Sequence, residues 1–299
     1  MKAWFAAVEA QEQAALADET VASFERTVER IRSRYERGLQ PSLDVRLGLV
    51  DLAGARTSAA ARRIARDRTV RQLEILLGRY PTGRLEAAGS LPEPPADVPA
   101  GLPAELLARR PDLIAAERRL AAAQRRNASD KRALLPRLTL TGSAGRSSSE
   151  LGDLLEGDFS VWSIAGGLLQ PLFQGGRLRA QVSRSGALSE AALADWANSV
   201  LVACAEIETL LASETHLRDQ ENEQRIRADE AGAAYEQARS RYERGLVDVT
   251  TLLSSQRSAA QARGSWLDAR RQRLEARVDL HLALGGDFGE APSSERSAS

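Results

Sequence analysis

The residues of this sequence that could carry out chemistry are few and widely separated. His216 and His281 each lie alone in a helical pattern, with no second ligand at the spacing of a metal site. Cys204 is the single cysteine, so the chain can form neither an internal disulfide nor a thiolate zinc cage. The glycine pairs at 166–167 and 175–176 lack the lysine of a phosphate-binding loop. We therefore expect no enzyme, no cofactor and no bound metal.

Charge and composition exclude further classes. Carboxylates are plentiful but alternate with arginines, as on solvated helix faces. Charged residues make up 27% of the chain and cancel to a formal net charge of zero, which leaves no basic surface for nucleic acid. Apolar residues make up 43% but aromatic residues only 4%, which favours thin seams between helices over a thick core. No apolar run is long enough for a transmembrane helix, and the N-terminus does not read as a signal peptide.

Apolar residues recur at three- and four-residue steps, which predicts long helices. The first covers 3–37 and stops before Gly38; Pro41-Ser42 opens a second that runs to Leu77. Proline and glycine then interrupt residues 79–103. Further helices are expected at 104–108, 112–135, 177–244 and 249–284, followed by a disordered tail from Gly285. The helix over 177–244 would be roughly 100 Å long, more than an ordinary globular domain needs.

One stretch reads as a pair of β-strands. Residues 137–145 alternate between polar and apolar side chains, and residues 159–173 form a second extended run after a polar loop. If the first strand crosses a membrane, one face would meet lipid and the other a lumen; the lipid side would be Leu138, Leu140 and Ala144, and the lumen side Thr139, Thr141 and Ser143. A half-buried strand of a soluble protein would alternate in the same way.

An internal repeat is the strongest signal in the chain. Residues 32–39 and 239–246 share the same eight letters, RSRYERGL, at a distance of 207 positions. The register then holds without a gap, because residues 76–78 fall on residues 283–285 at the same distance. The sequence therefore predicts two helical hairpins of similar design, which reverse at Gly38 and Gly245, and a pseudo-symmetric bundle rather than a solenoid.

Six segments carry a resemblance to a known family. They read RYERG at 34–38, GLPAELLARRPD at 101–112, LPRLTLTG at 135–142, VWS at 161–163, PLFQGGRL at 171–178 and RYERGL at 241–246. In wording and order they resemble the TolC-like outer-membrane factors, in particular the lipoprotein branch found with multidrug efflux pumps.

That resemblance implies a mainly α fold: long α-helical hairpins of a trimeric α-barrel, plus a β-hairpin that contributes to an outer-membrane β-barrel. It implies a homotrimer in outer-membrane lipid with helices in the periplasm, which docks to a periplasmic adaptor protein and an inner-membrane pump. The function expected from it is passive conduction in efflux.

On this resemblance we divide the chain into six parts. They are a first helical hairpin at 1–78, a proline-rich equatorial connection at 79–111, a helix of the second repeat at 112–136, the outer-membrane β-hairpin at 137–176, the second helical hairpin at 177–285 and a tail at 286–299. Leu138, Leu140, Trp162 and Ile164 would belong to membrane strands. Trp162 would be either an aromatic at the membrane interface or a packed side chain near the equatorial region.

The resemblance also places a periplasmic gate at the hairpin tips. Its candidates are Tyr35, Arg37, Gly38, Asp44, Tyr242, Arg244, Gly245, Asp248, Thr251 and Ser254. The two tyrosines and two arginines could pair across hairpins, or simply be solvated residues at helix ends, where the helix dipole favours arginine. Family members often carry aspartate where Thr251 and Ser254 stand, and Asp248 lies at a different offset, so an acidic ring is not assured.

The chain departs from the family at its start. Members open with a signal peptide and a first β-hairpin, whereas this sequence begins within a helix. We therefore expect a mis-assigned start or a fragment, since a trimer of this chain alone would offer too few strands for the barrel. Two alternatives stay open: a non-functional truncated remnant and a soluble coiled-coil interaction protein.

Overall fold

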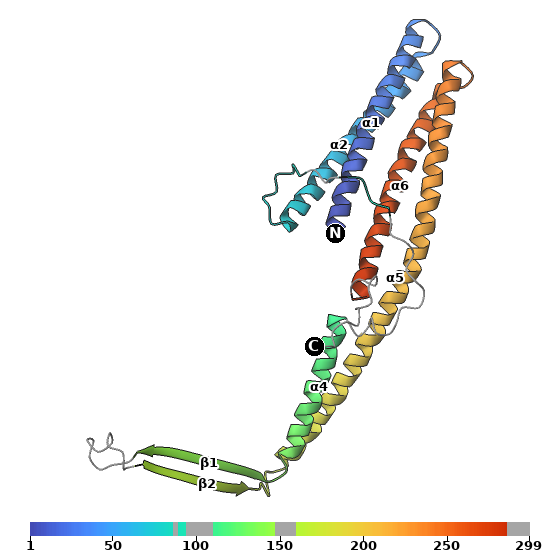
Figure 1. Cartoon of the computed structure of the whole chain (residues 1–299). Coiled ribbons are helices and arrows are strands. Elements are labelled where there is room, and N and C mark those ends of the chain that lie inside the picture. Colours follow the sequence, from blue (N-terminus) through green and yellow to red (C-terminus); the bar gives the residue numbers. More distant parts are fainter. Residues whose placement is uncertain (86–88, 94–109, 147–159, 286–299) are drawn as a thin grey trace, which may run out of the picture. The chain divides into compact units, whose positions relative to one another are not determined.

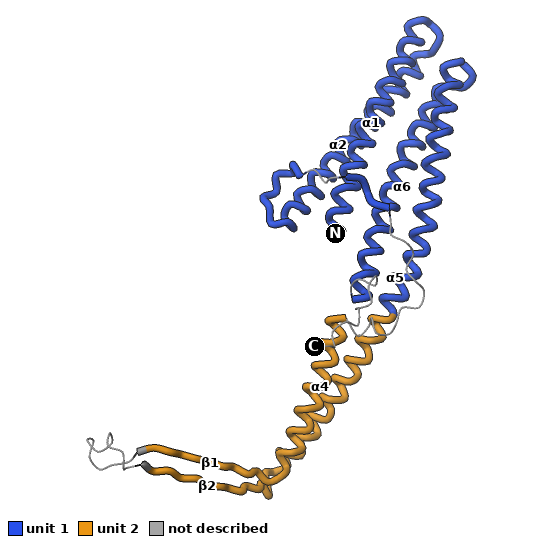
Figure 2. Tube along the Cα trace, viewed as in Figure 1, with its two compact units in different colours: residues 1–102, 205–299 blue, residues 103–204 orange. Residues whose placement is uncertain are grey.

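The structure is a computed structural model that describes residues 1–85, 89–93, 110–146 and 160–285 (Figure 1). The chain divides into two compact units (Figure 2). The first comprises residues 1–102 and 205–299, and the second residues 103–204. Helix α5 contributes to both, so its two parts are described with the unit to which each belongs.

The first unit is built from two antiparallel helical hairpins. Helices α1 (Lys2–Glu36) and α2 (Ser42–Leu76) form one hairpin. The C-terminal part of α5 (Arg177–Glu243) and α6 (Val249–Ala283) form the other, and α1 packs against both α2 and α6 (Figure 1). Each described helix lies within a few residues of its predicted range. The helix expected at 104–108 falls outside the described residues.

Both hairpins reverse through the same backbone motif. In the first, the Leu39 amide donates to the Arg34 carbonyl at 2.9 Å and the Gly38 amide to the Tyr35 carbonyl at 2.8 Å. The second repeats these two bonds 207 positions later, each at 2.9 Å. Gly38 and Gly245 have φ values of 71° and 76°, a conformation that side chains disfavour. The repeated octapeptide therefore encodes a repeated helix stop.

Next to the reversals, an apolar cluster joins all four helices of the first unit. Its buried members are Phe24, Val28, Ile31, Leu52, Tyr242, Val249, Leu252 and Leu253. Burying each large apolar side chain stabilises the fold by about 1.5–3 kcal/mol. A second cluster, around Phe5, Val8, Val70 and Leu274, closes the other end of α1 and α2. These clusters fix the hairpins against each other and so position the tip residues.

Polar side chains beside the first of these clusters link α1 to the second hairpin. The Thr27 hydroxyl donates to Gln256 Oε1 at 3.1 Å, and Gln256 Nε2 donates to the Ser23 hydroxyl at 3.0 Å. The Ser23 and Tyr235 hydroxyls lie 3.1 Å apart. Because Thr27 and Gln256 are both buried, this network specifies which faces of the helices meet.

Glu74 anchors the segment that follows α2. Its carboxylate accepts the Thr82 hydroxyl at 2.8 Å and the Gly83 amide at 2.7 Å, together with the amides of Arg84 and Leu85. These bonds, that of the Gly83 amide first, lower the pKa of the Glu74 carboxyl. The start of the proline-rich connection is therefore fixed to the end of α2.

The second unit contains helix α4 (Pro111–Arg132), strands β1 (Arg137–Arg146) and β2 (Ser160–Leu169), and the N-terminal part of α5. Proline occupies the first position of α4, where no amide donor is lost. Gln181 Nε2 on α5 donates to Asp130 on α4 at 3.3 Å. The two strands pair as an antiparallel hairpin.

The predicted end of the second strand was wrong. We expected an extended run from 159 to 173, but β2 ends at Leu169. Pro171 has no amide hydrogen to donate to a ladder, which accounts for the early stop. No described helix carries a stretch long and apolar enough to cross a bilayer.

Candidate functional site

The predicted tip residues lie in and just beyond the two helix reversals. Tyr35, Arg37 and Gly38 form the end of α1, and Tyr242, Arg244 and Gly245 form the end of α5. Asp44 lies in the first turn of α2, whereas Asp248, Thr251 and Ser254 begin α6. All ten belong to the first unit.

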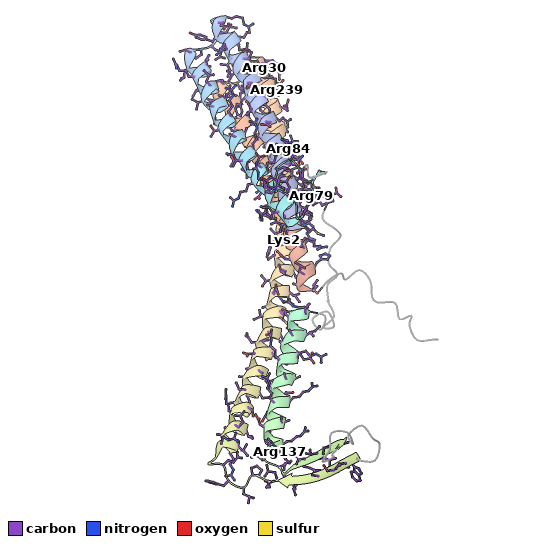
Figure 3. The ribbon with its side chains drawn as sticks, turned by 90° about the vertical axis from the view of Figure 1, so that its left-hand side faces the viewer. Lys2, Arg30, Arg79, Arg84, Arg137 and Arg239 are labelled. Carbon is purple, nitrogen blue, oxygen red and sulfur yellow. The ribbon has the colours of Figure 1, made fainter. Side chains whose placement is uncertain are left out.

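An arginine that the sequence did not single out joins the two tips. The Arg34 guanidinium lies 4.7 Å from the centre of the Tyr242 ring. It donates to the Tyr242 carbonyl at 2.9 Å and to the Glu243 carbonyl at 2.8 Å. Arg30, one turn earlier on α1, forms an ion pair of 2.7 Å with Glu243 and is labelled in Figure 3. Arg34 therefore binds the last carbonyls of α5, where the helix dipole is negative, and Arg30 binds the Glu243 carboxylate beside them.

The two equivalent tyrosines lie in different surroundings. Tyr242 is 2% exposed within the apolar cluster, whereas Tyr35 is 46% exposed. Burial raises the pKa of the Tyr242 hydroxyl, and the positive charge of Arg34 opposes this rise. Among the described residues, the Tyr242 hydroxyl has no hydrogen-bond partner. Within one chain, only the second tyrosine is clamped.

Arg37 and Arg244 bond to their own helices rather than across hairpins. Arg37 Nε donates to the Ser33 carbonyl at 3.1 Å, and Arg244 Nε donates to the Ser240 carbonyl at 3.2 Å. Both side chains are exposed. In this single chain they behave as solvated residues at helix ends.

Two acidic side chains influence each other at the starts of α2 and α6. Burial raises the pKa of the Asp44 carboxyl, and the negative charge of Asp248 raises it further. Asp248 caps α6 by accepting the Thr251 amide at 2.8 Å, and its bonds with Thr251 lower its pKa. Ser254 donates to the Thr251 carbonyl of its own helix at 3.1 Å. Of the two carboxyls, that of Asp44 therefore has the less stable charged form.

The strand register gathers the four predicted membrane residues on one face of the hairpin. Leu138 lies opposite Leu168, Leu140 opposite Gly166, Gly142 opposite Ile164 and Ala144 opposite Trp162. Directly opposite residues share a face, and alternate residues along a strand do too. Leu138, Leu140, Trp162, Ile164 and Leu168 are all between 68% and 80% exposed. The result is an apolar face that no described part of the chain covers.

The other face of the hairpin carries hydroxyl side chains. The Ser143 and Ser163 hydroxyls lie 2.8 Å apart as a cross-strand pair, and the Thr139 hydroxyl donates to the Gly167 carbonyl at 3.3 Å. Thr141 lies between them on the same face. The alternation expected for β1 is present, but β2 does not continue it, because Val161, Ala165 and Leu169 share this second face with Ser163. These hydroxyl side chains nevertheless lie on one side of the hairpin and Leu138, Leu140, Trp162 and Ile164 on the other.

A buried ion-pair network joins α5 to α6 in the first unit. Arg273 bridges Glu214 at 3.3 Å and Glu221 at 2.9 Å, and Arg277 approaches Glu214 at 3.4 Å. These side chains are at most 13% exposed. From the sequence we expected the carboxylates to lie on solvated helix faces. The pattern did not predict this network, because only the packing of α5 against α6 shows which side of each helix is buried.

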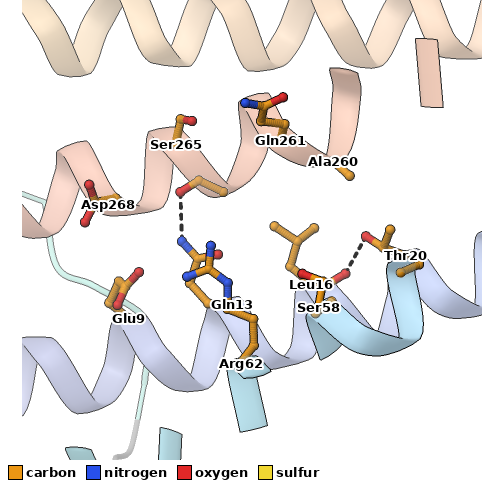
Figure 4. Close-up of a pocket in the computed structure, with 13 residues that line it drawn as sticks. Glu9, Gln13, Leu16, Thr20, Ser58, Arg62, Ala260, Gln261, Ser265 and Asp268 are labelled. Atoms are coloured by element: carbon orange, nitrogen blue, oxygen red, sulfur yellow. Dashed lines mark hydrogen bonds between the residues drawn. The ribbon is translucent and has the colours of Figure 1, made fainter. Parts of the chain in front are cut away.

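A cavity of about 620 Å³ lies between α1, α2 and α6 (Figure 4). Glu9, Gln13, Arg62 and Asp268 line it, and Gln13 Nε2 donates to the Gly264 carbonyl at 2.8 Å. No group of three histidine, cysteine or acidic side chains suited to a metal occurs in the described part of the chain.

Comparison with known proteins identifies the family. The profile described as "Outer membrane efflux protein" matches residues 102–286, more than half of the chain. The chain belongs to the outer membrane efflux protein family. This confirms the resemblance drawn from the sequence, and the family is a transport family rather than an enzyme family.

Two curated relatives of this efflux family illustrate the match. The chain is 33% identical to the toluene efflux pump outer membrane protein TtgF of Pseudomonas putida, over 96% of this chain and 60% of TtgF. It is 34% identical to the outer membrane protein OprJ of Pseudomonas aeruginosa, over 93% of this chain and 59% of OprJ. The chain therefore spans about three fifths of the length of these relatives.

Solved structures confirm the mainly helical fold with its β-hairpin. A membrane protein from Pseudomonas aeruginosa superposes with a TM-score of 0.84 at 32% identity, over 95% of this chain and 66% of that one. The outer-membrane channel OprN superposes with a TM-score of 0.85 at 26% identity, over 96% of this chain and 65% of OprN.

Proposed function

We propose that this efflux-family chain forms part of an outer-membrane channel, the exit duct of a tripartite efflux system. It carries out no chemistry and provides a passive conduit for small molecules. The observation that carries this proposal is the β-hairpin, in which Leu138, Leu140, Trp162, Ile164 and Leu168 form an exposed apolar face, whereas hydroxyl side chains of threonine and serine lie on the opposite face. A surface of this kind suits lipid on one side and water on the other.

The parts of the chain are assigned accordingly. The hairpins at 1–78 and 177–285 form the tunnel wall, 137–176 forms the membrane hairpin, 79–111 the equatorial connection and 112–136 the helix of the second repeat. The tail at 286–299 lies outside the described residues. This assignment is supported by the helical and strand bounds of the structure.

We assign a homotrimer of the full-length protein as the working form. Two strands leave unpaired backbone groups on their outer edges, and a bilayer does not tolerate unpaired edges. Further strands of the full-length protein and of its other copies would pair with these edges, and helices of those copies would complete the tunnel. The hairpin tips, with Tyr35, Asp44, Tyr242 and Asp248, form the periplasmic gate, which meets a periplasmic adaptor and an inner-membrane pump.

The exported compounds are small organic molecules in this proposal. This proposal is supported by the names of relatives, which include a toluene efflux pump protein and an antibiotic efflux pump protein of Pseudomonas putida. A conduit adds little selection of its own, so the pump would decide which compounds enter.

Deletion of the gene in its source bacterium tests the proposal. The deletion strain should accumulate more toluene inside the cells than the parent strain, and re-expression of the gene should restore the lower level. The restored protein should also sediment with the outer membrane. The proposal would fail if the parent and the deletion strain accumulated equal amounts of toluene and of every other compound that the partner pump exports. It would also fail if the protein stayed soluble.

A further inference from the structure

The internal repeat allows the contact within one chain to serve as a template for a contact between chains. In the chain, the tip of the first hairpin binds the tip of the second through Arg34 and Tyr242. The repeat places Arg241 at the position of Arg34 and Tyr35 at the position of Tyr242, 207 residues apart in each case. A second contact of the same kind could therefore form, with its arginine on the second hairpin and its tyrosine on the first.

Neither member of this second pair is used within one chain. Tyr35 is 46% exposed, and the Arg241 side chain is exposed. Across the described residues, the Arg241 guanidinium makes no hydrogen bond or ion pair. Its backbone is already in place, because both reversals form the same pair of bonds. The two halves of the contact are therefore present, each exposed beside a helix reversal of the same geometry.

We infer that Arg241 clamps the tip of the first hairpin of a second copy of this chain. Its guanidinium stacks over the ring of the partner's Tyr35 and donates to the carbonyls of the partner's Tyr35 and the partner's Glu36. These are the bonds that Arg34 makes to Tyr242 and Glu243 inside the chain. The inference rests on the proposed homotrimer and names the residues through which its copies meet.

The helix surfaces that follow the tips also favour a second copy of this chain as the partner. Gln256 on α6 is 3% exposed because it faces α1, but its equivalent on α2, Leu49, is 41% exposed. Arg271 on α6 faces Glu9, and its equivalent on α2, Ile64, is 70% exposed. Two exposed apolar side chains on α2 thus stand at positions that α6 uses for its contact with α1.

The equivalent positions on α5 suit a contact with this side of α2. Within the chain, Thr27 on α1 bonds Gln256 on α6. The equivalent of Thr27 on α5 is Ala234, and the equivalent of Gln256 on α2 is Leu49. The buried hydrogen bond within the chain thus corresponds to an apolar contact between Ala234 and the partner's Leu49. Gln13, which donates to Gly264, corresponds to Gln220, another glutamine. Both Ala234 and Gln220 are exposed in the single chain. Such a contact joins different surfaces of two copies, and a repeated contact of this type closes a ring.

Cross-linking between separate copies tests this contact. The protein is expressed from its own gene with Cys204→Ser, in two differently tagged forms, one with Tyr35→Cys and one with Arg241→Cys. A short bifunctional thiol reagent should join the two forms into a mixed dimer that carries both tags. A form with Arg34→Cys and Tyr242→Cys in the same chain should cross-link within that chain. This internal control checks that the reagent reports the known contact between Arg34 and Tyr242. Separate forms with Arg34→Cys and Tyr35→Cys should give no mixed dimer.

The mass of the same untreated preparation separates the two proposals. A trimer by light scattering that gives no Tyr35–Arg241 product, while the internal control reacts, overturns the inferred contact and leaves the proposed assembly standing. A monomer overturns both. A mixed dimer from Tyr35→Cys and Arg241→Cys, with none from Arg34→Cys and Tyr35→Cys, supports the contact. Arg241→Ala should also weaken association by about tenfold, in line with the loss of one stacked cation.

Discussion

The Arg34 guanidinium lies 4.7 Å over the Tyr242 ring and donates to the Tyr242 backbone carbonyl at 2.9 Å. The same side chain thus holds both the aromatic ring and the helix end of the second hairpin. Arg34 comes from the first copy of the repeated octapeptide and Tyr242 from the second. The repeat therefore encodes two similar hairpins and also the means by which one tip binds the other.

Replacement of Arg34 should loosen this joint. Arg34→Ala removes two charged hydrogen bonds and a cation–π contact, and should lower the free energy of unfolding by about 1–3 kcal/mol. Arg37→Ala is the matched control, because Arg37 bonds only its own helix, and it should cost less than about 0.5 kcal/mol. Urea unfolding followed by helical circular dichroism measures both. Equal effects of the two substitutions would contradict the assigned joint.

The Asp44 carboxyl should make the tip sensitive to pH. Its pKa is raised in the folded state, so folding is favoured while Asp44 is protonated, and this advantage is lost as the pH rises through the folded pKa. Asp44→Asn should therefore raise the melting temperature at pH 7, where the wild-type carboxylate is charged and faces Asp248. The gain should vanish below about pH 4, where the aspartate is protonated in both states. A gain that is equal at both pH values would show that the charge is not its cause.

The opposite sign is expected for Asp248. Its pKa is lowered by bonds with Thr251, so its contribution to stability is present at neutral pH and is lost as the pH falls through the folded pKa. Asp248→Ala should therefore lower the melting temperature at pH 7 and should do so less at acidic pH. This substitution serves as the control for Asp44→Asn, since each removes one carboxylate from the start of the second helix of its hairpin.

The buried network around Glu214 should be intolerant of partial removal. Glu214→Leu leaves Arg273 with one acidic partner and takes from Arg277 the carboxylate at 3.4 Å, so it should cost about 3–5 kcal/mol. The control is Glu25→Leu, whose ion pair with Arg56 is exposed and should be worth at most about 1 kcal/mol. Chemical unfolding of the two variants compares them. A cost for Glu214→Leu as small as that of the control would mean that the network is solvated.

The two faces of the β-hairpin should respond differently to charge. Leu140→Arg puts a cation on the apolar face and should cost about 2–4 kcal/mol if that face meets the bilayer centre. Thr141→Arg, at the next position, puts the same cation on the face with the hydroxyl side chains and should be tolerated. The measurement is the amount of protein that stays in the outer-membrane fraction after urea extraction. Equal retention of both variants would count against a lipid-facing side.

The helices and their ends could be predicted from the sequence because local signals determine them. Gly38 and Gly245 stop helices through a backbone conformation that other residues disfavour, and this needs no knowledge of packing. The alternation of β1 predicted its two faces for the same reason. The end of β2 was predicted too late, because apolar residues continue past Leu169 although Pro171 cannot extend the ladder.

The contacts between elements could not be predicted in this way. Tyr35 and Tyr242 stand in identical octapeptides, yet one is 46% exposed and the other 2% exposed. No local pattern distinguishes them, since the difference arises from which neighbouring helix covers each tip. The same holds for Glu74 and Glu214, which look like surface carboxylates in the sequence and are buried by packing. The gate roles proposed for the tip residues remain predictions.

The conductance of a planar lipid bilayer tests the central claim most directly. Protein expressed from its own gene and purified in mild detergent is added to one side, and the current is recorded under a fixed voltage. The account predicts stepwise increases of uniform size, which appear with wild-type protein and with Thr141→Arg but are lost with Leu140→Arg. A bilayer that stays insulating, while the same preparation is shown to be helical and inserted in lipid vesicles, would contradict the assignment of this chain to a channel.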